Sequence, residues 1–125
     1  KTYAQAELLF EQKKYEQCLK KLSNIENNFP GHALTDEVFF KKFEVFINLN
    51  EFDNAVNALE TICINHYFDI LFDDALFFLG ELYENVLKDP EKAKLKYEEI
   101  LLKEPDSIYS TQARKRYRNL RSYNF

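Results

Sequence analysis

The sequence contains few residues that interrupt regular secondary structure. Its 125 residues include 2 glycines, 3 prolines and 2 cysteines, and they include neither methionine nor tryptophan. So little glycine and proline leaves little material for the many tight turns of an all-β fold. No apolar run approaches the roughly 20 residues that cross a bilayer, which excludes a transmembrane helix. Because methionine is missing and Lys1 already lies in a helix-like pattern, we expect the chain to be a piece of a longer protein.

The residues that carry most enzyme and metal chemistry are equally sparse. Cys18 and Cys63 fit neither a zinc knuckle nor a redox dithiol, so we expect both to be small buried side chains. His32 and His66 have no partner three or four residues on with which to bind a metal. An acidic cluster lacks the glycine and closing glutamate of a calcium loop and suits the start of a helix instead: Asp69, Asp73 and Asp74. We therefore predict no enzyme activity, no metal and no cofactor.

Acidic residues outnumber basic ones. The chain has 21 Asp and Glu against 17 Lys and Arg, a net charge of −4, which argues against a dedicated nucleic-acid binder. Residues 113–125 nevertheless carry only basic charges. They form either a basic patch for an anionic surface or polymer, or a helical cap whose cations suit the helix end. We favour the cap, with Ala113, Tyr117 and Leu120 facing inward.

A pattern recurs every 37 or 38 residues. The segments 14–18, 51–55 and 89–93 each end in a small residue, followed at four and seven positions by apolar residues. Another apolar stripe of helical period precedes each segment. Each period therefore predicts two amphipathic helices joined by a tight turn. We expect one repeat domain over residues 1–125, with repeats at about 1–32, 33–68 and 69–105 and a capping helix over 106–122 that starts at Pro105-Asp106-Ser107.

The third period resembles the tetratricopeptide repeat almost position for position. The matching residues are Leu76-x2-Leu79-Gly80-x2-Tyr83 and then Ala93-x3-Tyr97-x2-Ile100-x4-Pro105, with one extra residue in the turn between the two helices. The first two periods match more loosely, since Phe43 stands where the family has a small residue. The resemblance implies an all-α fold, a right-handed α-solenoid of about three helical hairpins plus a C-terminal capping helix. It also implies a non-catalytic module for protein–protein interaction.

Two further features are similar to bacterial cell-envelope repeat proteins. The connections between repeats are longer than in the common 34-residue form. The ending Ala113-Arg114-Lys115-Arg116-Tyr117-Arg118-x-Leu120-Arg121 is also of the kind that closes such chains. This likeness favours the cell envelope or periplasm over the cytoplasm.

At steps of 37 residues, the first helices of the repeats present an aromatic residue with a glutamate four positions on. The pairs, which we name the ladder, are Tyr3 and Glu7, Phe40 and Glu44, and Phe77 and Glu81. Residues i and i+4 share one face of a helix, and the resemblance assigns that face to the concave surface of the solenoid. Together with Lys41, these residues are our candidate site for a protein or peptide partner with apolar and basic residues. The alternative is that the rings only stack on one another between repeats.

We therefore predict a scaffold that binds a protein or peptide segment in its concave groove. The alternative function is a structural or oligomerisation segment of a larger solenoid, with no peptide ligand. The sequence leaves the oligomeric state open.

Overall fold

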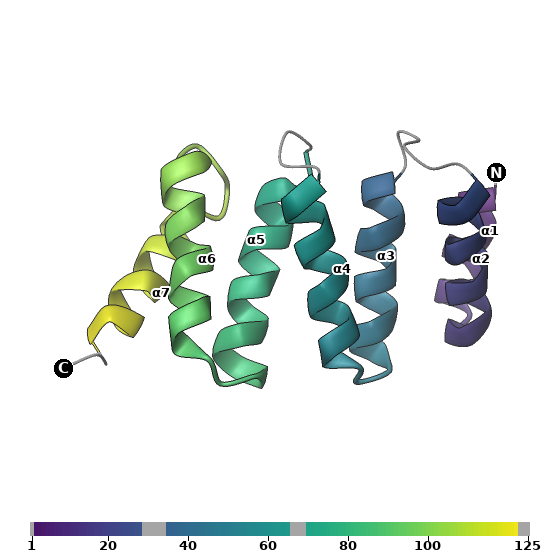
Figure 1. Cartoon of the computed structure of the whole chain (residues 1–125), viewed down its shortest axis with the longest axis horizontal. Coiled ribbons are helices and arrows are strands. Elements are labelled where there is room, and N and C mark those ends of the chain that lie inside the picture. The colour runs from purple at the N-terminus through teal and green to yellow at the C-terminus, as the bar shows by residue number, and fades with distance from the viewer. Residues whose placement is uncertain (1, 29–34, 66–69, 123–125) are drawn as a thin grey trace. The chain divides into compact units, whose positions relative to one another are not determined.

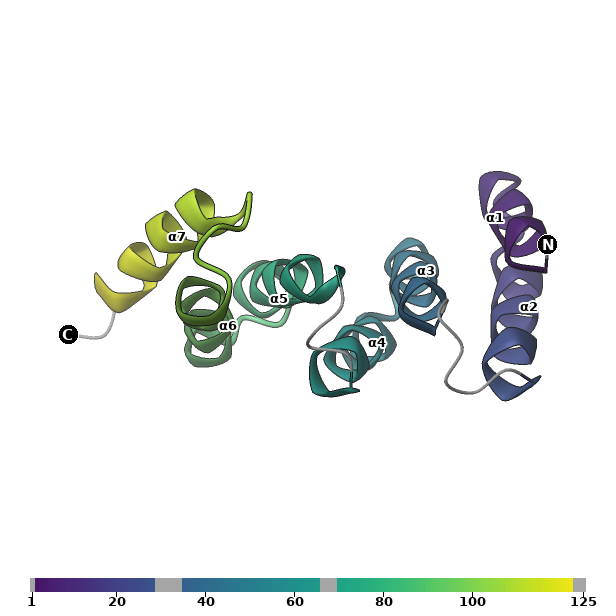
Figure 2. The ribbon, with the colours of Figure 1, turned by 90° about the horizontal axis from the view of Figure 1, so that it is seen from above.

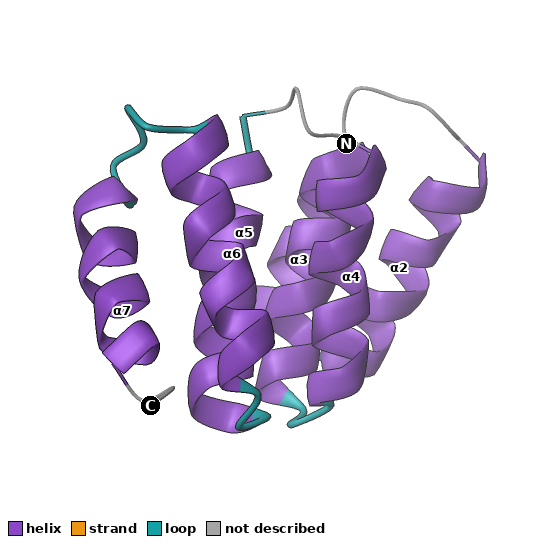
Figure 3. Cartoon of the chain, turned by 60° about the vertical axis from the view of Figure 1, so that its left-hand side comes forward, coloured by secondary structure: helices purple, strands orange, loops and turns teal. Residues whose placement is uncertain are grey.

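The computed structural model describes residues 2–28, 35–65 and 70–122, and every regular element within those ranges is a helix (Figures 1 and 3). Seven α-helices and one π-helical turn follow one another there, without a strand. The predicted all-α helical-repeat class is thereby confirmed, whereas the right-handed sense of the array stays a prediction. The predicted helix end at Pro30-Gly31 lies outside the described residues. The chain divides into two compact units, residues 1–62 and 63–125.

Unit 1 contains the first two helical hairpins. Its elements are α1 (Thr2–Glu11), α2 (Tyr15–Asn28), α3 (Thr35–Asn48) and most of α4 (Phe52–Asn65). α2 packs against both α1 and α3, and α3 and α4 run side by side in Figures 1 and 3. The apolar residues of α2 recur at helical spacing and form one buried stripe, Cys18, Leu22 and Ile25. With Ala6 of α1 and residues 38 and 45 of α3, this stripe makes the core that joins the three helices.

Each hairpin turns through one residue with a left-handed backbone. These residues are Lys13 (φ 61°), Asn50 (φ 59°) and Lys88 (φ 54°). They stand 37 and 38 residues apart, so the period of the sequence reappears in the backbone. In the first turn, the N–H of Lys13 donates to the Phe10 carbonyl and the N–H of Lys14 donates to the Leu9 carbonyl, both at 2.9 Å. This pair of bonds is a Schellman motif, which satisfies the last carbonyls of the helix. The second turn has the same two bonds.

Unit 2 contains the third hairpin and the capping helix. Its elements are α5 (Phe72–Glu81), a π-helical turn η1 (Leu82–Val86), α6 (Pro90–Lys103) and α7 (Ser110–Ser122). α6 packs against both α5 and α7 (Figures 1 and 2). α6 starts as the sequence predicts, because the Asp89 carboxylate accepts a hydrogen bond from the Lys92 N–H at 3.2 Å and Pro90 occupies the first helical turn.

The extra residue of the third repeat lies in the helix and not in the loop. The backbone hydrogen bonds that begin in η1 span more residues than the four of an α-helix. The Leu87 N–H donates to the Leu82 carbonyl at 2.9 Å, and the Asp89 N–H donates to the Tyr83 carbonyl at 2.7 Å. A π-helical turn is the form that a one-residue insertion takes inside an α-helix. The third turn therefore keeps its left-handed residue, Lys88, at the same place relative to the next helix.

Gly80 allows the two helices of the third hairpin to approach closely. A Cβ atom at this position would lie 2.5 Å from the Tyr97 ring of α6. Tyr97 is fully buried, so its ring has no room to move aside. The glycine of the repeat signature is thus required by the large aromatic side chain that faces it.

The capping helix begins later than predicted, at Ser110 and not at residue 106. Pro105-Asp106-Ser107 belongs to a turn, in which the Ser107 N–H donates to the Glu104 carbonyl and the Ser107 hydroxyl accepts from the Tyr109 N–H, both at 3.0 Å. The Ser107 hydroxyl also donates to Asp73 of α5 at 2.6 Å. This hydrogen bond stabilises the turn, so the helix does not begin at residue 106. As predicted, Ala113 and Leu120 of α7 are buried, while Tyr117 is half-buried.

Candidate functional site

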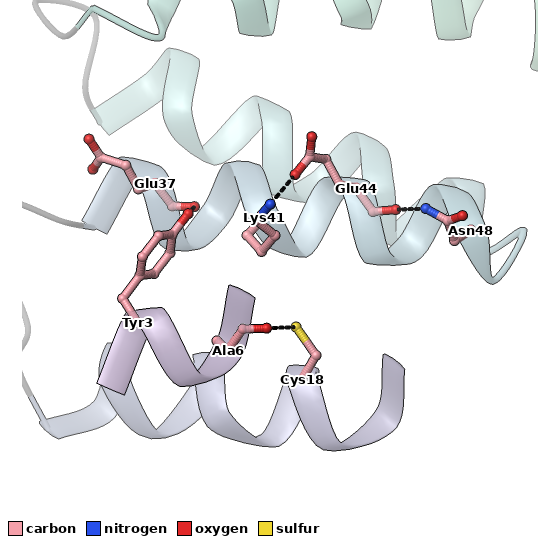
Figure 4. Close-up of polar contacts among 7 residues, drawn as sticks. All are labelled: Tyr3, Ala6, Cys18, Glu37, Lys41, Glu44 and Asn48. Carbon is pink, nitrogen blue, oxygen red and sulfur yellow. Dashed lines mark hydrogen bonds and ion pairs between the residues drawn. The ribbon is translucent and has the colours of Figure 1, made fainter. Parts of the chain in front are cut away.

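The first ladder pair, Tyr3 and Glu7, lies on α1. The Tyr3 side chain is half-buried, and its hydroxyl donates a hydrogen bond to the backbone carbonyl of Glu37 on α3 at 3.4 Å (Figure 4). Burial raises the pKa of the Tyr3 phenol, and nearby carboxylates, Glu7 first among them, raise it further. The hydroxyl therefore stays protonated and able to donate. Glu7 itself is exposed.

The second ladder pair lies on α3 with Lys41 between its members. Phe40 is half-buried, and its ring centroid lies 5.3 Å from that of Phe43. The Lys41 ammonium lies 2.8 Å from a Glu44 carboxylate oxygen (Figure 4) and 4.5 Å from the centroid of the Phe10 ring on α1. Lys41 thus links α1 to α3 by a cation–π contact and pairs with the ladder glutamate of its own helix.

The third ladder ring, Phe77 on α5, is almost sealed from water. It is 7% exposed. Its ring stacks on that of Tyr109, with centroids 4.5 Å apart and planes 16° from parallel, and it also contacts Tyr97 at 5.9 Å. The Arg116 guanidinium of α7 covers it at 5.2 Å from the ring centroid. This ring therefore packs against Tyr109 and α7, and its partner Tyr109 is not one of the ladder rings.

Arg116 also engages the ladder glutamate of α5. Its Nη1 donates to a Glu81 carboxylate oxygen at 2.9 Å and to the Tyr97 hydroxyl oxygen at 3.3 Å. The Tyr97 hydroxyl in turn donates to a Glu84 oxygen at 2.8 Å. One guanidinium therefore connects α7 to both helices of the third hairpin.

The acidic residues at the start of α5 have a second role besides complementing the helix dipole. Asp73 accepts from the Ser107 hydroxyl at 2.6 Å, and Asp74 accepts from the Tyr109 hydroxyl at 2.5 Å. Burial raises the pKa of the Asp74 carboxyl, while the hydrogen bond from Tyr109 partly offsets that rise. The two aspartates hold the turn that precedes α7 against α5.

A pocket of about 330 Å³ lies between η1, which follows Glu81 in the chain, and α7. η1 contributes two of its lining residues and α7 contributes four: Glu84, Asn85, Gln112, Lys115, Arg116 and Asn119. Three of these side chains end in a carboxamide, which both donates and accepts hydrogen bonds. The pocket is therefore polar, carries charges of both signs and lies one helical turn beyond the third ladder pair.

Sequence analysis did not single out Tyr109, Arg116 or Asn85. Arg116 follows the inward-facing Ala113 by three positions, so helical spacing was a usable signal that it points toward α5 and α6. Tyr109 lies in a turn and Asn85 in a π-helical segment, where neither helical nor strand periodicity applies.

Nothing in the described part of the chain gathers enough ligands for a metal site, because no three His, Cys, Asp or Glu side chains meet there. The predicted positions His32, His66 and Asp69 lie outside that part. Cys18 is buried as expected, and its thiol donates to the Ala6 carbonyl at 3.3 Å (Figure 4). Cys63 is partly exposed. Among the helices of the described residues, none is both long and apolar enough to span a membrane.

Comparison with known families identifies the third hairpin. The family model of the tetratricopeptide repeat matches residues 74–107, which cover most of α5, all of η1 and α6, and the turn as far as Ser107. Comparison with curated proteins gives no match. Repeats of this family generally serve protein–protein interaction and scaffolding, and are not catalytic. Residues 74–107 therefore match the tetratricopeptide repeat, within a chain whose described residues form successive helices.

Proposed function

We propose that the chain is a non-catalytic module that holds an extended segment of a partner protein along its first-helix faces. The observation that carries this proposal is the polar pocket between η1 and α7. It lies one helical turn beyond the third ladder pair, next to the residues that the sequence pattern singles out. Phe77 and Glu81 then hold Arg116, which lines the pocket, in place and do not contact the partner themselves.

The chemistry of the pocket suits a peptide backbone. Asn85, Gln112 and Asn119 each present a carbonyl oxygen and an NH₂ group, which complement the N–H and C=O of a peptide bond. A segment without secondary structure has those groups available. The volume of about 330 Å³ lies at the lower end for ligand sites, so we expect the pocket to hold only a few residues.

In unit 1, the proposed contacts are the remaining ladder residues. Glu7 is exposed and Glu44 is partly exposed, so this surface favours a segment with cations. Tyr3, Phe40 and Lys41 are half-buried beside these carboxylates, and their apolar parts favour aliphatic or aromatic anchors.

The pocket is tested with peptides selected from a random library against the intact chain. In the variant Asn85→Ala/Asn119→Ala, we expect the Kd of the selected peptides to rise about tenfold or more, because two groups that pair with the backbone are removed. The matched control is Asn24→Ala/Asn57→Ala, which changes two exposed asparagines of α2 and α4. Equal binding by both folded variants would remove the pocket from the proposal.

The unit 1 surface is tested with the basic members of the same selection. Glu7→Gln/Glu44→Gln should weaken their binding about three- to tenfold, since exposed charge pairs each contribute roughly 0.2–1 kcal/mol. The control Glu16→Gln/Asp53→Asn removes two exposed carboxylates on α2 and α4. If both variants lose affinity equally, only overall charge matters and the ladder has no special role.

A second function, as a structural or oligomerisation segment of a larger solenoid, is favoured by the packing of the ladder. The ladder ring Phe77 lies under Tyr109 and under Arg116 of α7. Lys41, next to the ladder ring Phe40, lies over Phe10 of α1. Sedimentation over a range of concentrations separates the two functions. Stable self-association without peptide binding supports the structural one.

A location in a bacterial cell envelope stays a prediction. It rests on the long connections between repeats and on the basic ending of the chain.

A further inference from the structure

Every arginine of the chain lies in α7. The four arginines are Arg114, Arg116, Arg118 and Arg121, whereas the other cations among the 17 Lys and Arg are all lysines. Residues 110–122 contain no acidic residue. Arginine and lysine differ in what they recognise, because the planar guanidinium matches a carboxylate with two parallel hydrogen bonds. The concentration of this one residue type in one helix calls for an explanation.

At least two of the four arginines have contacts that packing of the cap accounts for. Arg116 points inward and engages Glu81, Tyr97 and Phe77. Arg121 lies in the last turn of α7, where the helix dipole favours a cation, and its guanidinium lies 5.8 Å from the centroid of the Tyr117 ring. Neither effect accounts for Arg114, which lies in the first half of α7.

The other three arginines share one exposed face. Arg114, Arg118 and Arg121 stand at positions i, i+4 and i+7, which align along a helix, and each is exposed. We name this surface the arginine face. The buried residues Ala113 and Leu120 define the inward side of α7, which is separate from the arginine face. The pocket residues Gln112 and Asn119 lie on a third side, so the arginine face is distinct from the site of the proposed function.

We propose that the arginine face binds an acidic helix of a partner protein, in which Asp or Glu residues recur at i, i+4 and i+7. Such a helix repeats its carboxylates over the same rise of roughly 10 Å that separates Arg114 from Arg121, so that each guanidinium meets one carboxylate. The ion pair of Arg116 with Glu81 is the same contact formed within the chain, between α7 and α5.

Two other anionic partners fit this surface less well. A membrane-binding helix needs apolar side chains beside its cations, whereas the apolar residues of α7 are buried or half-buried. A nucleic acid carries about one charge per 1.7 Å of duplex, and a chain with a net charge of −4 repels such a polymer more than it repels a short acidic helix.

The test uses the intact chain and a synthetic alanine-based peptide of about 18 residues, long enough to form a helix in water, with glutamates at i, i+4 and i+7. A second peptide has the same composition, with its glutamates distributed around the helix. We expect the aligned peptide to bind more tightly. Arg114→Gln/Arg118→Gln/Arg121→Gln should raise its Kd about tenfold or more, since three charge pairs are lost.

Two variants control for charge. Lys13→Gln/Lys14→Gln/Lys20→Gln removes three exposed cations of unit 1 and should leave the Kd within about twofold. Arg114→Lys/Arg118→Lys/Arg121→Lys keeps the charge but removes the forked geometry, and should lie between wild type and the glutamine variant.

Several results would overturn the proposal. The first is equal affinity of the chain for the two peptides. The second is an equal loss of peptide affinity when the three arginines and when the three unit 1 lysines are changed to glutamine. The third is arginine-dependent binding to phosphatidylglycerol vesicles or to an oligonucleotide that is tighter than binding to the aligned peptide. Self-association that depends on the three arginines would also overturn it, because the acidic partner would then be a second copy of the chain. Since none of these variants alters the pocket, the proposed function stands or falls separately.

Discussion

Both units place a cation over an aromatic ring where helices meet, but the ion pair that this cation forms differs between the two units. In unit 1, Lys41 lies over the Phe10 ring and pairs with Glu44 of its own helix. In unit 2, Arg116 lies over the Phe77 ring and pairs with Glu81 of another helix. A lysine whose ion pair stays within one helix adds little to the contact between helices. A guanidinium with several donors joins three helices at once, so unit 2 has the more strongly connected interface.

The largest expected effect comes from the ladder rings. Phe77→Ala should lower the free energy of unfolding by about 3–5 kcal/mol, because it removes a buried ring and leaves a cavity. Phe40→Ala should lower it by about 1–2 kcal/mol, since that ring is only half-buried. Denaturant unfolding followed by circular dichroism gives both values. Equal losses would show that the two rings are equally important to the fold, and would end the comparison.

The two cations provide a second test. Arg116→Ala should lower the free energy of unfolding by about 1–3 kcal/mol, because Glu81 and Tyr97 lose a charged partner in a partly buried place. Lys41→Ala should lower it by no more than about 1 kcal/mol, as is usual for a pair within one helix and a single cation–π contact. The same unfolding experiment measures both. A larger loss for Lys41 would contradict the ranking of the two interfaces.

The left-handed turn residues should respond alike in both units. Lys13→Gly and Lys88→Gly should each raise the free energy of unfolding by about 0.5–1 kcal/mol, because glycine adopts a positive φ without strain. Asn50→Gly should raise it by less, since asparagine tolerates this conformation. Differential scanning calorimetry of the three variants is sufficient. A gain at Lys13 but not at Lys88 would indicate that η1 relieves the strain of the third turn.

The smallest effect concerns pH and is confined to unit 2. The pKa of the Asp74 carboxyl is raised in the folded chain, so its protonated form is favoured there. Stability from this group is present below its unfolded pKa of about 3.9 and is lost as pH rises toward the folded pKa. Asp74→Asn keeps an acceptor for the Tyr109 hydroxyl and should be more stable than wild type by a few tenths of a kcal/mol, about 0.3, at neutral pH. The difference should vanish near pH 3, and a constant difference would contradict this cause.

Much of the fold follows from the sequence because helical hairpins form from local patterns. The spacing of Cys18, Leu22 and Ile25 predicts the buried stripe of α2, and Asp89-Pro90 predicts the start of α6. The predicted start of α7 was wrong by four residues, because a hydrogen bond to the distant Asp73 holds Ser107 in a turn. Contacts between residues far apart in the sequence leave no periodic signal.

The candidate site was less accessible to prediction for the same reason. The ladder pairs are visible in the sequence, but whether a ring faces water depends on what packs over it. Phe77 is covered by Tyr109, which lies in a turn, and by Arg116, which belongs to a helix that begins 29 residues after α5 ends. The pocket depends on η1, whose wider rings bring Glu84 and Asn85 to its wall.

The π-helical turn separates the length of a repeat from the path of its backbone. An insertion in a loop changes the orientation of the next helix, and every later hairpin of a stack would then be displaced as well. With the additional residue held inside a helix, Lys88 is still left-handed and still lies two positions before the next helix, as Lys13 and Asn50 do. A repeat built this way accommodates one more residue and still keeps the period of the array at its bend.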